Sequence, residues 1–438
     1  MSSLQVLVPR YLVPVKPRAQ VLEQHAVVLQ SGRIREILDV ESARSKYPNA
    51  VWLEFPTHVM LPGLINMHTH SAMTLLRGYA DDLELNTWLR DHIWPAEKRW
   101  LSPEFVRDGT ELAIAEMLRC GTTCFSEMYF FPETIADVVD QAGMRACIGS
   151  PIIEFETAWA SGFDQYFEKA MRLRADLRGH ERLTMALAPH AAYTVTDSML
   201  ERIAEASSRY DLCVHMHLLE IAWEIQHSLQ EFNERPLKRL QRLGLLNHRF
   251  LAVHMAHLSD DDIESLAANE VNVIHCPESN LKLASGFCPV AKLQSAGVNV
   301  AVGTDGAASN NNLDLVGELR TAALLAKGLA GDPCAVDAAT AIEMVTINAA
   351  KALGLEGSIG SIETGKSADL CAIDLEWPET QPVHHVLSQV VYAASSRQVS
   401  DVWVQGQRLL KEGHLMTLDV PGIRDRAKNW NRRMGVQA

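Results

Sequence analysis

Short apolar runs alternate with segments of helical periodicity through the central part of the chain. The runs occupy residues 59–67, 122–128, 144–153, 183–189, 211–217, 250–254, 271–276 and 298–304. Each is short enough for a strand, and the segments between them carry helix signatures. Eight strand–helix alternations of this length predict a parallel (β/α)₈ barrel, of the TIM type, over residues 59–359.

Two of the intervening helices have clear start signals. Ser102-Pro103-Glu104 supplies a cap, a first-turn proline and an acid before an expected helix at 105–119, and Gly121 ends that helix. Ser259, followed by three aspartates, opens another helix before residues 263–268. These signals support the alternating pattern.

The two ends of the chain have a different pattern. Strand-like runs at 26–29, 370–374 and 401–405 are punctuated by glycines, and neither end carries enough apolar residues to bury a core alone. We therefore expect residues 1–58 and 360–438 to form one composite domain, a small β-sandwich built from both termini.

Composition narrows the class of protein. The 438 residues carry 40 basic and 54 acidic side chains, a formal net charge of −14, which argues against nucleic acid or an anionic membrane as the main partner. No apolar stretch is long enough to span a bilayer, and no signal-peptide core is present. The eight cysteines contain no CxxC pair, so a reducing compartment fits best. We expect a cytoplasmic protein.

Candidate chemistry begins at the end of the first apolar run, with His68-Thr69-His70. Alternate residues on a strand share one face, so His68 and His70 can hold one ion. With 17 histidines in the chain, chance alone predicts about 0.7 such pairs, so the pair is weak evidence by itself. Asp305, after the last run, is placed to complete the site.

The other strand ends strengthen this interpretation, because catalytic groups of such barrels lie at the carboxyl ends of the strands. The fourth run ends at His190, the fifth at His217 with Glu220 beyond it, the sixth at His254 and His257, and the eighth at Asp305. Five of the eight strand ends therefore carry histidine or aspartate, a concentration typical of a metal-dependent hydrolase.

These motifs resemble the amidohydrolase superfamily, and within it the 5′-methylthioadenosine/S-adenosylhomocysteine deaminases. The resemblance rests on Pro62–His70 with His-x-His, the 73–78 segment Met-Thr-Leu-Leu-Arg-Gly, Trp88-Leu89, Pro95-Ala96-Glu97 and the 279–286 segment Ser-Asn-Leu-Lys-Leu-Ala-Ser-Gly. The 348–354 and 365–370 segments also resemble the superfamily's C-terminal signature. The similarity extends over nearly the whole chain.

The resemblance implies a metal held by His68, His70, His217 and Asp305. Members with two metals bridge them through a lysine or glutamate on the third or fourth strand, and residues 183–189 contain neither. Glu154 and Glu156 follow the third strand but are expected in its loop. One Zn²⁺ per subunit is therefore expected, although Fe²⁺ or another transition metal also suits these ligands.

A mechanism follows from the movement of charge. Attack of water at C6 of an adenine ring places negative charge on N1, and Glu220 is the candidate acid for N1. Asp305 can take the proton of the water and pass it to the departing amine, while His254 holds the water from the side. Alternatives remain: Glu220 can serve as a helix-start carboxylate, and His257 competes with His254, which the resemblance favours.

Two further histidines are expected outside the ligand set. His215 shares the parity of His217 but lies one layer deeper, so a hydrogen-bonded core role is expected for it. His275 precedes Cys276-Pro277 and is expected to be structural or to support a ligand from behind.

The resemblance also implies contacts with substrate. The position of Glu97 holds the ribose hydroxyls in the family, and that of His190 contacts the purine; Trp88 is a candidate wall of the site. A solvated helix acid and a core tryptophan are the simpler alternatives for Glu97 and Trp88. One departure is informative: residues 150–160 contain no arginine and two acids, where relatives that bind the homocysteine carboxylate use arginines.

These features predict a zinc-dependent deaminase of 5′-methylthioadenosine or adenosine, with S-adenosylhomocysteine disfavoured. A guanine or triazine aminohydrolase is the close alternative, and a non-catalytic barrel scaffold is a remote one. A homo-oligomer, a dimer or tetramer, is expected from the resemblance. Residues 360–367 also match the phosphate-loop pattern GxxxxGK[ST], but a strand rather than a helix is expected to follow, so a turn is predicted there.

Overall fold

All eight predicted strands form one parallel sheet that curves into a barrel. In the computed structural model, which describes residues 4–435, they run in the order β6 (Leu64–Thr69), β7 (Thr122–Met128), β8 (Arg145–Ile152), β9 (Leu183–Pro189), β10 (Cys213–Leu218), β11 (Phe250–His254), β12 (Asn272–His275) and β13 (Asn299–Val302). Beyond β13, the backbone N–H of Asp305 donates to the carbonyl of His68 at 2.9 Å and joins the last strand to the first. The fold class is confirmed.

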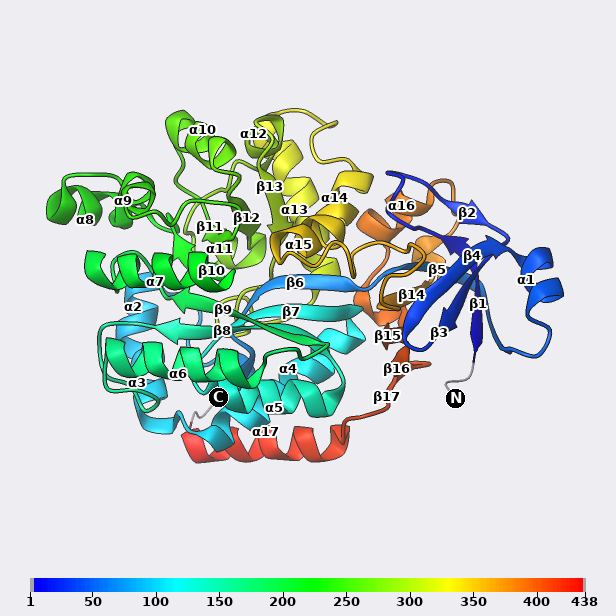
Figure 1. Cartoon of the computed structure of the whole chain (residues 1–438), viewed down its shortest axis with the longest axis horizontal. Helices are drawn as coiled ribbons and strands as arrows, with labels where there is room; N and C mark the ends of the chain where they lie inside the picture. The colour runs from blue at the N-terminus through cyan, green and yellow to red at the C-terminus, as the bar shows by residue number, and fades with distance from the viewer. Residues whose placement is uncertain (1–3, 436–438) are drawn as a thin grey trace.

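Helices cover the outside of the barrel (Figure 1), and the two with predicted start signals follow their capping serines. Helix α4 (Pro103–Arg119) follows Ser102, whose hydroxyl accepts the N–H of Phe105 at 3.2 Å. Helix α10 (Asp260–Ala268) starts with a capping box between Ser259 and Asp262. The other long helices of the barrel are α5 (Pro132–Ala142), α6 (Phe163–Asp176), α7 (Asp197–Tyr210), α8 (Ala222–Phe232) and α13 (Leu315–Ala330).

The two ends of the chain share a second sheet beside the barrel (Figure 1). Its path is β17 (His414–Leu415), β16 (Gln407–Lys411), β15 (Val399–Val404), β14 (Leu370–Asp374), β5 (Val51–Pro62), β1 (Gln5–Leu12), β3 (His25–Gln30) and β4 (Arg33–Asp39), with β2 (Leu22–Glu23) paired to β1. Apolar side chains lie on both faces: Val6 joins one buried cluster, while its neighbour Leu7 joins the other. Strands β5 and β14 unite the two termini.

The first predicted run, residues 59–67, is divided between the two sheets. Residues up to Pro62 belong to β5, where Pro62 pairs with Leu370 of β14, and the barrel strand β6 starts at Leu64. A Cβ atom at Gly63 would approach Thr123 to 2.1 Å, so only glycine fits this close crossing. Because the apolar pattern is continuous over residues 59–67, the sequence does not reveal that the chain passes from one sheet to the other. Our division of the chain at residues 58 and 359 stays a prediction.

The C-terminal helix α17 (Val420–Met434) returns to the barrel and packs on α4 (Figure 1). Its Trp430 is buried, stands edge-on to Phe105 and donates its indole N–H to Asp108 at 2.7 Å. The C-terminal part of the chain therefore packs against the barrel through α17 after its strands β14–β17 have joined the terminal sheet.

The phosphate-loop look-alike at 360–367 is a turn, as expected. It lies between α15 (Ile347–Ala352) and strand β14, so the next element after Ser367 is a strand rather than a helix, and Gly360 and Gly365 adopt positive φ values of 86° and 91°. Among the described residues, no helix combines the length and apolar character needed to cross a membrane.

Candidate active site

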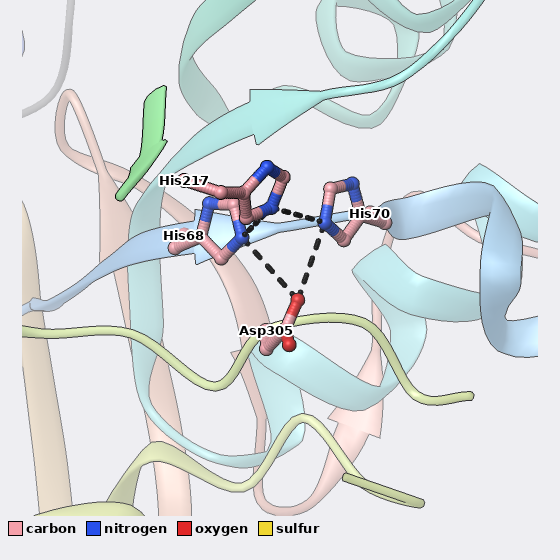
Figure 2. A group of neighbouring side chains, drawn as sticks. All are labelled: His68, His70, His217 and Asp305. Atoms are coloured by element: carbon pink, nitrogen blue, oxygen red, sulfur yellow. Dashed lines mark hydrogen bonds and ion pairs between the residues drawn. The ribbon is translucent and has the colours of Figure 1, made fainter. Parts of the chain in front are cut away.

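Four side chains predicted as metal ligands meet at the carboxyl end of the barrel (Figure 2). His68 and His70 come from the end of β6, His217 from β10 and Asp305 from the turn after β13. The Nε2 atom of His217 lies 3.1 Å from that of His68 and 3.2 Å from that of His70. Asp305 Oδ1 lies 3.3 Å and 3.2 Å from the same two Nε2 atoms. All four side chains are buried.

These spacings fit a single ion. Ligands about 2.0–2.1 Å from Zn²⁺ can lie roughly 3–4 Å apart, and the four donor atoms of this cluster all lie within 4.8 Å of one another. Among the described residues, this is the one group of three or more histidine, cysteine or acidic side chains able to hold a metal ion. The donor set therefore fits one metal.

Hydrogen bonds behind the cluster fix which nitrogen faces the ion. His70 and His217 direct Nδ1 to the carbonyls of Met128 and His190, which can only accept, so their Nε2 atoms are free for a metal. His68 Nδ1 lies 3.0 Å from Nε2 of His215. His215 is therefore a buried supporting histidine rather than a ligand.

The carboxylate of Asp305 favours positive charge beside it, although burial lowers the pKa of His68 to about 4. Burial opposes ionisation of His70, but the hydrogen bond and charge of Asp305 outweigh burial and raise the pKa of His70 to about 9. Asp305 is held by Ser279 and Ser309, whose hydroxyls donate to Oδ2 at 2.7 and 2.8 Å, while Oδ1 faces the imidazoles. A metal cation supplies the charge that this arrangement stabilises.

Glu220 and His254 lie together beside the cluster. His254 Nδ1 contacts Oδ1 of Asn280 at 2.9 Å, and its Nε2 lies 3.6 Å from Oε2 of Glu220. Burial raises the pKa of Glu220 above its ordinary value. A carboxyl group that holds its proton more tightly in a buried site is suited to act as an acid near neutral pH.

A cavity of about 670 Å³ opens over the cluster. The predicted substrate contacts Trp88, Glu97 and His190 all line it, together with Glu220, His254 and Asp305. Glu97 accepts the phenol O–H of Tyr129 at 2.7 Å, and withdrawal from water raises the pKa of Glu97 to about 7. His190 Nδ1 is buried with no hydrogen-bond partner in the described part of the chain, which leaves it available to a ligand.

Neither His257, the competitor of His254, nor His275, expected to have a structural or supporting role, lines the cavity. His257 Nε2 contacts the carbonyl of Ser285 at 2.6 Å, and His257 does not line the cavity. His275 is buried at the end of β12 and is likewise absent from the cavity lining. The geometry therefore favours His254.

Several neighbours of the site were missed from the sequence. Tyr129 follows the end of β7, Glu127 lies on that strand and accepts the hydroxyl of Thr69 at 2.7 Å, and Ser279 and Asn280 follow β12. Extending the strand-end rule to hydroxyl and amide side chains identifies Tyr129, Ser279 and Asn280, whereas Glu127 lies within its strand.

Comparison with known proteins agrees with this geometry. A model of the amidohydrolase family matches residues 59–409. This chain belongs to the amidohydrolase family. A curated relative from Teredinibacter turnerae, a 5-methylthioadenosine/S-adenosylhomocysteine deaminase, is 48% identical over 98% of this chain and 97% of its own length.

Solved structures of similar proteins support the family and the fold. The crystal structure of an adenosine deaminase from Xanthomonas campestris with bound zinc is 50% identical to this amidohydrolase, with a TM-score of 0.97 over 98% of each chain. An atrazine chlorohydrolase from Arthrobacter aurescens TC1 has a TM-score of 0.90 at 21% identity, over 97% of this chain and 99% of its own. At that identity the likeness concerns the fold alone.

Proposed function

We propose that this amidohydrolase removes the 6-amino group of an adenine nucleoside by hydrolysis, releasing an inosine-type nucleoside and ammonia. The preferred substrate is 5′-methylthioadenosine, adenosine is also accepted, and S-adenosylhomocysteine is a poorer substrate. The observation that carries the proposal is the cavity, which joins a metal-ligand cluster, the acid Glu220 and the acceptor Glu97 in one space. The names of the similar proteins from Teredinibacter and Xanthomonas support it.

His68, His70, His217 and Asp305 would hold one Zn²⁺, which when bound would lower the pKa of water in the site to about 7. Asp305 accepts a proton from the attacking water and delivers it to the departing amine. Glu220 donates its proton to N1 of the purine, where negative charge develops, and regains a proton from the new C6 hydroxyl as that group becomes a carbonyl. His254, fixed by Asn280 at 2.9 Å, orients the water from the side.

The remaining cavity residues bind the nucleoside. Glu97 accepts hydrogen bonds from the two ribose hydroxyls, a task suited to a carboxylate. His190 turns its unpartnered Nδ1 to the purine, and Trp88 forms part of the wall. A free purine base or a triazine carries no ribose, so Glu97 would keep its bond from Tyr129 but gain no partner from the substrate; this favours a nucleoside over guanine or triazine substrates.

The mouth of the cavity favours an apolar 5′ substituent. Ile153, Phe155 and Ala158 from the loop after β8 line it, and Phe155 faces Trp94 with ring centroids 6.2 Å apart. Glu156 lines the same region, and Lys98 is the one lysine or arginine among the described lining residues. A methylthio group suits this surface, whereas the homocysteine carboxylate meets an acid and lacks an arginine.

The complete donor set argues against a non-catalytic scaffold, because a scaffold has no need of four converging ligands. We further propose that the enzyme works in the cytoplasm as a homo-oligomer. Its eight cysteines are free thiols, which supports a reducing compartment.

Parallel assays of ammonia release test the function. Zinc-loaded enzyme is assayed with 5′-methylthioadenosine, adenosine, S-adenosylhomocysteine and guanine, with chelator-treated enzyme as the control. We expect the highest kcat/KM for 5′-methylthioadenosine, a measurable value for adenosine and a lower one for S-adenosylhomocysteine. Turnover of guanine alone, or of none of the adenine nucleosides, would reject the proposal.

A further inference from the structure

Glu224 is a buried residue whose carboxylate accepts hydrogen bonds from the backbone around Glu220. It is the third residue of α8, is 4% exposed and does not line the cavity. Its two oxygens accept the backbone N–H groups of Leu219, Glu220 and Ile221 at 3.0, 2.7 and 3.2 Å. All three N–H groups of the turn that carries Glu220 therefore donate to the side chain of Glu224.

These N–H groups are the hydrogen-bond donors that the structure gives to the Glu224 carboxylate. No cation forms an ion pair with it among the described residues. Burial, and next the charge of Glu220, raise the pKa of Glu224 to about 7. A buried carboxylate without a counterion is costly, so the position is poorly explained by fold stability alone.

The other side of the turn is fixed by the neighbouring strand end. The N–H of Met255 donates to the carbonyl of Leu218 at 3.1 Å, and the N–H of Ala256 donates to that of Leu219 at 3.0 Å. Leu219 itself adopts a left-handed φ of 51°, which is unfavourable for a branched side chain. The turn is thus held in a strained form from both sides.

By contrast, the carboxylate of Glu220 has only loose contacts of its own. Ser285 Oγ lies 3.4 Å from Oε1, and His254 Nε2 lies 3.6 Å from Oε2. The direction of the side chain is therefore set by the backbone beneath it. We propose that Glu224 is a positioning residue, which holds the 219–221 turn so that the Glu220 carboxylate faces the reacting ring of the substrate.

Ordinary helix capping explains only part of this arrangement. An acid at the third helical position commonly accepts the N–H of the cap residue, here Ile221. The bonds to Leu219 and Glu220 lie before the helix and add nothing to its cap. This proposal rests on the proposed deamination for its kinetic consequence, whereas its structural consequence can be measured independently.

The test compares Glu224→Gln with Ser259→Ala. The amide offers one acceptor oxygen, so the N–H of either Leu219 or Glu220 faces an NH₂ group. Ser259→Ala removes the N-cap of α10, the helix that follows β11. Ser259 does not line the cavity. For Glu224→Gln with 5′-methylthioadenosine we expect kcat to fall about 10- to 100-fold, with KM within about twofold and zinc content unchanged. Ser259→Ala should lower Tm and leave kcat unchanged.

Wild-type kcat in Glu224→Gln, or parallel loss of kcat, zinc and substrate binding, would overturn the proposal. Glu224→Asp keeps both carboxylate oxygens but places them farther from the N–H groups of the turn. If the glutamine variant does not fold, the same outcomes in Glu224→Asp support or overturn the proposal. A crystal structure of either variant gives a readout that needs no turnover. We expect the 219–221 turn and the Glu220 carboxylate to be displaced; an unmoved Glu220 rejects the positioning role even if the substrate has been misassigned.

Discussion

His68 and Asp305 are joined twice. The backbone N–H of Asp305 donates to the carbonyl of His68 at 2.9 Å, and the Asp305 carboxylate lies 3.3 Å from Nε2 of the same histidine. One contact closes the barrel between its first and last strands, and the other forms an edge of the metal-ligand cluster. Metal binding and barrel closure therefore share one pair of residues.

Removal of the metal should destabilise the barrel as well as abolish activity. A ligand at 100 times its Kd stabilises the folded state by about 2.7 kcal/mol, so chelation should lower Tm by several degrees. Activity should be lost, and added Zn²⁺ should restore both. Calorimetry and ammonia release on the same samples check this expectation. Full activity in protein stripped of all metal would contradict it.

Replacement of Glu220 should affect chemistry more than binding. Glu220→Gln keeps the shape of the side chain but removes the proton for N1, so kcat should fall about 10²- to 10⁴-fold. KM and zinc content should change little. Glu231→Gln, an exposed position on α8, the helix that follows Glu220, is the matched control for steady-state kinetics. A variant with unchanged kcat would assign the acid to another residue.

Glu97 should destabilise the folded protein at alkaline pH. Its pKa is raised to about 7 by burial, although the bond from Tyr129 opposes this. The folded state thus holds the proton more tightly than the unfolded chain, so stability falls as pH rises towards 7 and the cost is fully present above it. Glu97→Gln should raise the free energy of unfolding by about 1–3 kcal/mol at pH 8 and leave it unchanged near pH 4.

The same substitution should weaken substrate binding. An amide accepts the ribose hydroxyls less well than a carboxylate, so KM for nucleosides should rise about 10- to 100-fold. Denaturant titrations at the two pH values and kinetics at pH 8 measure the opposed effects. A Glu97→Gln protein that is less stable at pH 8, or that keeps a wild-type KM, would show that the carboxylate has another role.

Phe155 should control the choice of 5′ substituent. Phe155→Arg places a cation in the mouth of the cavity, so kcat/KM should rise about tenfold for S-adenosylhomocysteine and fall for 5′-methylthioadenosine. Because Phe155 is 48% exposed, the fold should tolerate the change. Phe287→Arg, at an exposed phenylalanine outside the cavity lining, is the control. An unchanged ratio of the two kcat/KM values would place the substituent elsewhere.

Much of the fold could be predicted because its signals are local. Alternating runs predict the barrel, and Ser102 and Ser259 cap the helices that they precede. The split of residues 59–67 could not be predicted, since both sheets require the same apolar side chains there. Only the contact of Gly63 with Thr123, distant in sequence, reveals the crossing.

The candidate site divides in the same way. His68, His70, His217 and Asp305 follow from strand parity and strand ends. Glu224 could not be found by such rules, because its role depends on three backbone N–H groups of a turn. The direction of backbone N–H groups cannot be read from residue types. Tyr129 was overlooked because a tyrosine after an apolar strand resembles packing until Glu97 is seen beside it.

Strand β5 lies between β1, made at the start of synthesis, and β14, made near its end. During synthesis, the edge of β5 that pairs with β14 has no partner strand until roughly 300 more residues have been added. At ~5–20 residues per second this takes about 15 to 60 s. During that interval the nascent chain exposes unpaired N–H and C=O groups to other chains. Premature termination before Leu370 would make this exposure permanent, so incomplete chains should depend on chaperones or be degraded.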